Sequence, residues 1–311
     1  MISRPFFIRA LAASAAVLAL GSTWAADAYP SKEIRLIVPW NAGGSNDIAA
    51  RSLADILREK GVTVIVENVP GATGAIGMGT SSTLALMAQG LTQLKSEQFT
   101  PIARVTVDPL ILLVPAGSPN STLEAFVANV KKNPGKVSIG TPGSNNLNHI
   151  FAVMTGRAAS ADVIVVPYTG GAKVVADLAG KQIDGGVLKP SETKAQIDGN
   201  LVKPIGVFAN ERLKVLPGVP TFKEKGYDVF PHGPLVQMAY IAAPANLPPA
   251  VREKLTALFR DAIQSAKFKT VAEQGGALVD DLTGPALAKE IAGVEQSLAV
   301  VGKQVFVAEK K

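Results

Sequence analysis

The most constraining feature of this chain is a regular alternation of short apolar runs with helical patterns. Residues 34–38 form a buried strand pattern, residues 46–60 an amphipathic helix that Gly61 ends, and residues 63–67 a second strand. Strands that alternate with helices in this way favour parallel sheets covered by helices, which is an α/β fold. The alternation continues, with helices expected over 122–132, 149–157, 172–179 and from 192, and strands over 137–140, 163–167, 183–188 and 204–208.

Two apolar stretches look like strands that connect two separate lobes. They cover residues 105–115 and 235–244, and helical patterns over 249–267 and 285–302 close the chain. The sequence therefore predicts an interrupted first lobe with a second lobe inserted into it. The expected limits are 26–113 for the first part of lobe I, 114–238 for lobe II, and 239–311 for the return of lobe I.

The N-terminal segment has the pattern of a secretory signal peptide. Arg4 and Arg9 precede an apolar run over 10–21, and Thr23-Trp24-Ala25 offers a cleavage site after residue 25. The run has about 12 residues, whereas a membrane-spanning helix needs about 20. We therefore expect a signal peptide over 1–25 and a periplasmic protein. Without any cysteine, the sequence predicts no disulfide and no lipid attachment.

The composition indicates a folded globular protein. Hydrophobic residues make up 47% of the chain and charged residues 18%, which is typical of a folded globular protein. The formal net charge is +6, but lysines and arginines are spread along the chain. The chain has no basic block of the kind that binds nucleic acids, so we expect no nucleic-acid partner.

The first candidate site is the turn between strand 34–38 and helix 46–60. Gly43 and Gly44 let the backbone approach a ligand closely, and Ser45 or Asn46 can cap the helix. The unpaired N–H groups of a helix start suit a carboxylate or phosphate, although ordinary turn chemistry is the alternative for this loop alone. The candidates in this loop are Trp40, Asn41, Gly43, Gly44, Ser45, Asn46 and Asp47.

Three further turns leave strands in the same way, over 141–149, 167–172 and 189–192. In open α/β sheets, ligands bind beyond the carboxyl ends of the strands. Four donor-rich turns at equivalent strand ends, divided between two lobes, favour an anion site over plain turns. The candidates are Ser144, Asn145, Asn148, His149, Tyr168, Thr169, Gly170 and Ser191.

Enzyme and cofactor motifs are missing from the sequence. Its two histidines, His149 and His232, have no partner at metal-ligand spacing, and no Gly-x-Ser-x-Gly elbow occurs. The glycines of 71–77 have Gly-x-x-Gly-x-x-Gly spacing, which differs from the dinucleotide-binding pattern. We expect no catalytic residue, no metal and no cofactor.

Several short motifs follow one another along the chain. They are Ile34-Arg35-Leu36-Ile37-Val38-Pro39 with Gly43-Gly44, Val66-Glu67-Asn68-Val69-Pro70-Gly71-Ala72, Phe99-Thr100-Pro101-Ile102-Ala103-Arg104-Val105, Asn133-Pro134-Gly135-Lys136, Val166-Pro167-Tyr168-Thr169-Gly170, Leu216-Pro217-Gly218-Val219-Pro220-Thr221-Phe222 and Ala242-Ala243-Pro244. In these motifs the chain resembles the receptors of tripartite tricarboxylate transporters, known as the Bug family.

The resemblance implies a type II-like periplasmic-binding-protein fold with a ligand cleft between two α/β lobes. It further implies a monomeric receptor that holds a small organic carboxylate, either a di- or tricarboxylate or an aromatic acid. In the family, turns equivalent to 40–47 and 141–149 bind the carboxylates, and Ser81 and Ser82 would face the cleft. Membrane permease subunits would be the partner. A sensor that signals to a membrane kinase is an alternative role, and an enzyme acting on a small anion is less favoured.

Two departures from the family pattern stand out. The segment between Ile76 and Gly79 is shorter by about one βα unit, so either 81–88 is recruited to fill the gap or lobe I is destabilised. Trp40-Asn41-Ala42 also replaces a proline-containing stretch, which makes that loop less rigid. Trp40 is compatible with stacking on an aromatic ligand or with packing as a lid.

Overall fold

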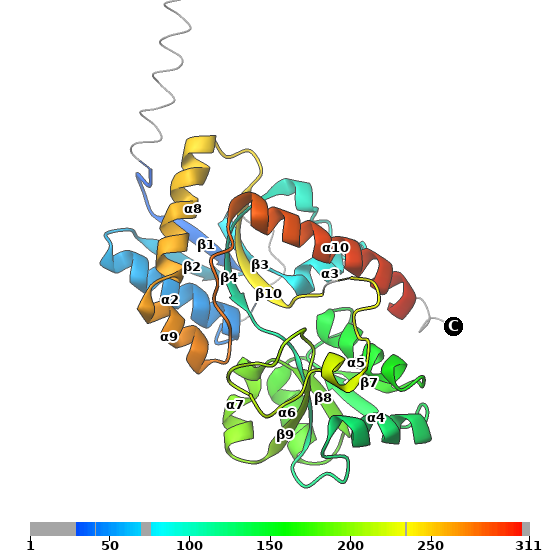
Figure 1. Cartoon of the computed structure of the whole chain (residues 1–311). Coiled ribbons are helices and arrows are strands. Elements are labelled where there is room, and N and C mark those ends of the chain that lie inside the picture. Colours follow the sequence, from blue (N-terminus) through cyan, green and yellow to red (C-terminus); the bar gives the residue numbers. More distant parts are fainter. Residues whose placement is uncertain (1–28, 41, 70–75, 234, 307–311) are drawn as a thin grey trace, which may run out of the picture.

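The computed structural model describes residues 29–40, 42–69, 76–233 and 235–306, which form two five-stranded sheets flanked by helices (Figure 1). The signal peptide expected over 1–25 lies outside the described residues, as does Asn41. Within the described ranges, no helix has the length and apolar character needed to cross a membrane.

The first sheet has the strand order β2-β1-β3-β10-β4. Its strand β1 pairs in parallel with β2 and β3, whereas β10 is antiparallel to β3 and β4. The strands are β1 (Ile34–Val38), β2 (Val64–Asn68), β3 (Ile76–Thr80), β4 (Phe99–Val107) and β10 (Met238–Pro244). One face packs on α2 (Ser45–Glu59), α8 (Pro249–Ile263) and α9 (Ala266–Gln274), and the other on α3 (Ser81–Ala88) and α10 (Gly284–Phe306).

The second sheet has the strand order β7-β6-β8-β5-β9. Strands β7, β6 and β8 run in parallel, so the turns that follow them leave the same edge of the sheet. The strands are β5 (Ile111–Pro115), β6 (Ser138–Thr141), β7 (Ile164–Pro167), β8 (Gly185–Leu188) and β9 (Val202–Val207). The flanking helices are α4 (Leu123–Lys132), α5 (Leu147–Ala158), α6 (Gly171–Ala179) and α7 (Pro190–Asp198).

The chain passes between the two sheets twice, at 108–110 and at 235–237. The backbone N–H of Asp108 donates to the carbonyl oxygen of Gln237 at 2.9 Å, so the two passages lie side by side. The single connecting strand expected over 105–115 is therefore wrong: β4 and β5 are separate strands in different sheets. The expected limit at 113/114 falls inside β5, which pairs entirely in the second sheet, and the domain limits stay a prediction.

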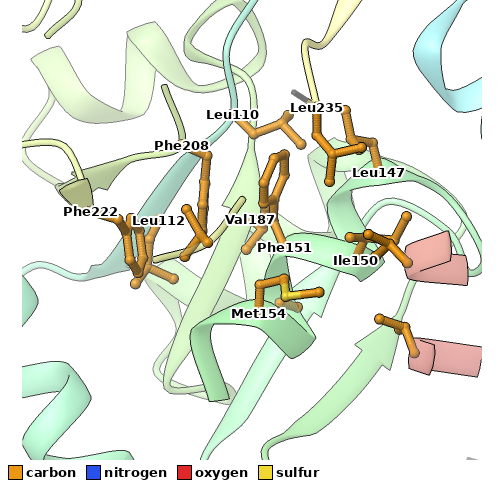
Figure 2. Close-up of a cluster of buried hydrophobic side chains, with 14 of the residues drawn as sticks. Leu110, Leu112, Leu147, Ile150, Phe151, Met154, Val187, Phe208, Phe222 and Leu235 are labelled. Carbon is orange, nitrogen blue, oxygen red and sulfur yellow. The ribbon is translucent and has the colours of Figure 1, made fainter. Parts of the chain in front are cut away.

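A large buried cluster joins the second sheet to both passages (Figure 2). Phe208 stacks between Phe151 and Phe222, with ring centroids 4.5 and 4.4 Å away. Leu110 and Leu235, one from each passage, lie in the same cluster and are nearly inaccessible. Burying such a side chain contributes about 1.5–3 kcal/mol to folding. The passages are therefore anchored in a core and are not exposed linkers.

The C-terminal helices differ in one respect from the sequence prediction. The single helix expected over 249–267 is two helices, α8 and α9. Ser265 is the N-cap of α9, and its Oγ accepts a hydrogen bond from the N–H of Phe268 at 3.2 Å. A side-chain cap of this kind starts a new helix within an otherwise continuous apolar pattern.

The shortened segment after β2 is organised around strand β3. Residues 81–88 form helix α3, with Leu84 and Ala85 buried in the cluster that includes α10. Within β3, Gly79 lies against the ring of Tyr240, and a Cβ built there would be 2.4 Å from the Tyr240 Cζ. The absence of a side chain at Gly79 therefore makes room for the buried tyrosine.

We expect the substitution Gly79→Ala to lower the free energy of unfolding by about 1–3 kcal/mol, because the added methyl overlaps a buried ring. Chemical denaturation measures the change. Gly218→Ala is the matched control, since a Cβ at Gly218 has no neighbour within 4 Å. The control is expected to be neutral or slightly stabilising. Equal stability of the two variants would contradict this account of β3.

A buried carboxylate fixes the turn between β1 and α2. Asp47 is 3% exposed. It accepts hydrogen bonds from the Gly43 N–H at 2.9 Å, Arg51 Nε at 3.1 Å and Asn68 Nδ2 at 2.9 Å. Burial alone raises the pKa of Asp47, but the hydrogen bonds from Arg51, Gly43 and Asn68, with the Arg51 charge, lower it overall. The turn is thereby tied to the end of β2.

Asp47→Ala should destabilise the protein by about 1–3 kcal/mol at pH 7, because it removes the charge-assisted hydrogen bonds that tie the turn to Arg51 and Asn68. Because its pKa is lowered in the folded protein, Asp47 contributes to the free energy of unfolding above about pH 4. This contribution is lost as the pH falls through the folded-state pKa. Denaturation curves of wild type and variant should therefore converge in acid. Asp55→Ala, which removes an exposed ion pair with Arg58, is the control and should change stability little. A pH-independent difference between wild type and Asp47→Ala would refute the titration argument.

Candidate functional site

A cavity of about 500 Å³ lies between the helices of the first sheet and those of the second. From the first sheet it is lined by the start of α2 and by α9, and from the second by the starts of α6 and α7. Its lining includes Gly43, Gly44, Ser45, Asn46, Asp108, Gly171, Ser191 and Glu192. Donor groups and carboxylates thus meet in one place, although they come from separate parts of the chain.

The helix starts around this cavity differ from the other helix start that was predicted to bind a carboxylate. The N-cap residues of α2 and α6 are Gly44 and Gly170, neither of which can supply a side-chain cap. By contrast, Asn146 caps α5, because its Oδ1 accepts a hydrogen bond from the N–H of His149 at 3.0 Å. Uncapped helix N–H groups and the positive end of the helix dipole attract an anion. The first-turn N–H groups of α2 therefore remain available to a ligand, whereas one of those of α5 is already bound by Asn146.

Lys189 extends from the second sheet to the start of α2. Its Nζ donates to Ser45 Oγ at 3.1 Å and lies 3.8 Å from Asp108 Oδ2. Ser191 Oγ donates to the same Asp108 oxygen at 2.7 Å. A cation, two hydroxyl groups and a buried carboxylate thus form one cluster across the two sheets.

Asp108 is the buried member of this cluster, with 4% of the residue exposed. Burial raises its pKa to about 6, against the opposing effects of the Lys189 charge and the Ser191 hydrogen bond. Its Oδ1 atom has no hydrogen-bond partner among the described residues. A buried carboxylate with one unsatisfied oxygen in a cavity wall is typical of a functional site.

The sequence prediction missed both charged members of the cluster. Lys189 begins the fourth turn that we singled out, but of that turn only Ser191 was taken as a candidate. Asp108 stands in the apolar stretch 105–115, where an acidic residue is itself an unusual signal. The contact between Asp108 and Lys189 could not be predicted, because only the relative position of the two sheets brings these residues together.

Among the predicted candidates, Gly43, Gly44, Ser45, Asn46 and Ser191 line the cavity. Gly170 is next to the lining residue Gly171, and Asp47 is buried in the turn below.

Three other candidates lie elsewhere. Trp40 and Ser82 line a separate, mostly apolar cavity of about 240 Å³ beside β3. Ser81 is fully buried, where its Oγ donates to the carbonyl of Val236 and accepts from the Met238 N–H at 3.2 Å. These contacts give Ser81 a structural role.

The 141–149 turn is held by its own hydrogen bonds and lines neither cavity. The Asn145 N–H donates to His149 Nδ1 at 3.3 Å, and Gln89 Nε2 donates to the Asn145 carbonyl at 2.9 Å. Asn148 Nδ2 donates to the carbonyl of Val187 at 2.9 Å, and Tyr168 Oη, from the 167–172 turn, donates to Asp177 at 2.9 Å. The remaining candidates, Ser144 and Thr169, are exposed at these turns. A ligand role for all of these residues stays a prediction.

Comparisons with known proteins identify the family. The family model described as "Tripartite tricarboxylate transporter family receptor" matches residues 49–284. A UPF0065 protein of Bordetella pertussis is 30% identical, covering 85% of this chain and 87% of its own length. The solved periplasmic binding protein BugD is 27% identical with a TM-score of 0.76, covering 90% of this chain and 99% of its own.

A further solved structure, MatC from Rhodopseudomonas palustris with bound malate, has a TM-score of 0.75 at 23% identity. It covers 88% of this chain and 100% of its own, and at this identity it shows the shared fold. The similarity to BugD confirms the predicted α/β fold of the periplasmic-binding-protein kind. The family match confirms the resemblance that the sequence motifs indicated. The chain therefore belongs to the receptor family of tripartite tricarboxylate transporters, and it is a solute-binding receptor and not an enzyme.

Proposed function

We propose that this receptor captures a small organic carboxylate in the periplasm and delivers it to the membrane permease subunits of a tripartite transporter. One observation carries the proposal. The uncapped start of α2 faces a 500 Å³ cavity, and Lys189 from the opposite sheet lies 3.1 Å from its first residue, Ser45. The family membership supports the transporter, and the sequence of 1–25 supports export.

A solute carboxylate placed at this helix start would receive three kinds of stabilisation. Backbone N–H groups of the first turn donate to it, the helix dipole contributes about 0.3–1 kcal/mol, and Lys189 supplies a charge-assisted hydrogen bond of about 1.5–3 kcal/mol. A dissociation constant near 1 μM corresponds to about −8 kcal/mol. Exposed charges in water contribute little, so this affinity requires that the cavity closes around the solute and excludes water.

Closure of the two lobes is the motion that we infer. The passages at 108–110 and 235–237 are the two connections at which a hinge would act. A solute held by Ser45 on one side and Lys189 on the other would favour the closed form, because only that form makes both contacts. The closed form would then be the one that the permease binds.

Thermal-shift titration of the purified protein tests the solute class. We expect carboxylates, with malate, succinate, citrate and benzoate as probes, to raise the melting temperature. A solute at about one hundred times its dissociation constant adds about 2.7 kcal/mol to the free energy of unfolding. For a protein of this size, that raises the melting temperature by about 5–10 °C. A response to sugars or simple amines alone would show that the proposal is wrong.

The substitution Ser45→Glu tests the location of the site. A carboxylate at the first residue of α2 would occupy the helix start, pair with Lys189 and repel the solute, so affinity should fall by at least about tenfold. Stability should not fall, because an acidic residue is favourable in a first turn. Ala250→Glu puts the same charge into the exposed first turn of α8 and should leave binding unchanged. Unchanged affinity in Ser45→Glu would place the site elsewhere.

A further inference from the structure

Among the described residues, two buried side-chain atoms lack a hydrogen-bond partner, and both belong to the passages between the sheets. They are Asp108 Oδ1, from the first passage, and Gln237 Oε1, from the second. The two residues are 4% and 5% exposed. Each oxygen has given up water without gaining a donor, which is unfavourable in a protein interior. The passages therefore hold two acceptors that both need a hydrogen.

These two side chains project from opposite positions of the two passages. The antiparallel ladder of β4 and β10 ends with Val107 opposite Met238, and the Asp108 N–H then donates to the Gln237 carbonyl at 2.9 Å. Asp108 and Gln237 are thus the next opposite pair. Opposite residues of antiparallel strands point to the same face, with Cβ atoms about 4.5–5.5 Å apart. The carboxyl group of one passage accordingly lies beside the carboxamide of the other.

One proton would satisfy both oxygens. Two acceptors cannot bond to each other, but a protonated carboxyl group has an O–H that donates. A proton on Asp108 Oδ1 would turn this atom into a donor to Gln237 Oε1. The single O–H···O bond would link the two passages through their side chains, in addition to the backbone hydrogen bond that already joins them.

The charges around Asp108 allow both of its forms. Lys189 stabilises the ionised form, as does the hydroxyl of Ser191, whereas Glu192 disfavours it. The described cavity lining from α2, α6 and α9 carries no charge. Burial outweighs the effect of Lys189 and raises the pKa of Asp108 to about 6. The carboxyl group can therefore gain or lose its proton near neutral pH.

Lys189 connects this proton to the solute. Its Nζ donates to Ser45 Oγ at 3.1 Å and lies 3.8 Å from Asp108 Oδ2. A solute carboxylate at the start of α2 would take Lys189 as its partner, so Asp108 would lose part of its countercharge. Loss of an opposite charge favours the protonated carboxyl group. By linkage, a protonated Asp108 would in turn leave Lys189 available to the solute.

We propose that Asp108 and Gln237 form a proton-binding site between the two passages, and that the receptor takes up a proton there when it binds its carboxylate solute. The proton comes from the solvent and neutralises the carboxylate of Asp108. The coupling rests on the proposed function, whereas the proton site does not. Asp108 and Gln237 act on the solute through Lys189 and are positioning residues.

Carbon-13 NMR of the solute-free protein, labelled at its aspartate carboxyl carbons, tests the proton site. The signal that disappears in Asp108→Asn belongs to Asp108. We expect this signal to titrate near pH 6 in the wild type. Titration near pH 4, the ordinary value for an aspartate, would overturn the proton site.

The substitution Gln237→Met tests the partner, because it keeps the length of the side chain and removes the amide. If protonated Asp108 donates to Gln237 Oε1, the loss of this acceptor should lower the pKa of Asp108, with about a threefold to tenfold loss in proton affinity. If the amide is rotated so that Nε2 donates to an ionised carboxylate, the pKa should rise. A rise or no change would overturn the proton site.

Controls accompany this variant. Gln274→Met, an exposed change on α9, should leave the titration of Asp108 unchanged. Melting temperatures show whether Gln237→Met is folded, and Gln237→Leu is the second variant if it is not.

Isothermal titration with malate tests the coupling. If the solute raises the pKa of Asp108, the gain in affinity is complete below about pH 6 and is lost as the pH rises through the solute-bound pKa. Between pH 6 and pH 8, the affinity of the wild type should therefore fall at least about threefold more than that of Asp108→Asn. The titration of malate itself is common to both proteins and cancels. At pH 6.5, buffers of different protonation enthalpy should show a larger proton uptake by the wild type.

The outcomes separate the coupling from the proposed function. Equal pH dependence and equal proton uptake in the wild type and Asp108→Asn would overturn the coupling while leaving a carboxylate receptor intact. Failure of malate, succinate, citrate and benzoate to bind would overturn the proposed function and the coupling with it. The carbon-13 titration, which needs no solute, decides the proton site in either case.

Discussion

The double passage of the chain between its two sheets is the constraint on which the rest of the structure depends. Both passages are buried: Leu110 and Leu235 share one core cluster, and the Asp108 N–H binds the Gln237 carbonyl at 2.9 Å. Their position fixes which ends of the two sheets face each other. The start of α2 consequently lies opposite the start of α7, and a cavity forms between them.

The same constraint explains why charged groups are tolerated at the passage. A buried carboxylate is unfavourable unless other groups compensate for the lost water, and Asp108 is only half compensated by Ser191 and the more distant Lys189. A purely structural solution would use an apolar residue here, as Leu110 does two residues later. Retaining Asp108 in the cavity wall is accordingly better explained by solute recognition than by stability.

Much of the fold could be predicted from local pattern, because apolar periodicity reflects burial. Strand β1 was expected at its observed limits, and α2, α4 and α6 within about one residue, since their burial alternates as the pattern requires. Strand β3 was missed, because Gly77 and Gly79 give no apolar signal; at Gly79 the ring of Tyr240 fills the space. The site was predicted in part: the turns were recognisable, but the cluster of Lys189 with Ser45 joins residues that are 144 positions apart. No local sequence pattern predicts a contact between residues so far apart in the chain.

The 39–47 and 141–149 turns have similar sequence patterns, but their internal hydrogen bonds differ. These hydrogen bonds determine which backbone donors each turn leaves for a solute. In the 141–149 turn, Asn146 caps α5, and the Asn145 N–H binds His149, so these donors already have partners inside the protein. In the 39–47 turn, Asp47 accepts a hydrogen bond from the Gly43 N–H, which precedes the helix, and the first turn of α2 has no side-chain cap. Two turns with similar composition therefore differ in the donors they leave for a solute. This difference, together with Lys189, concentrates the attraction for a carboxylate at the start of α2.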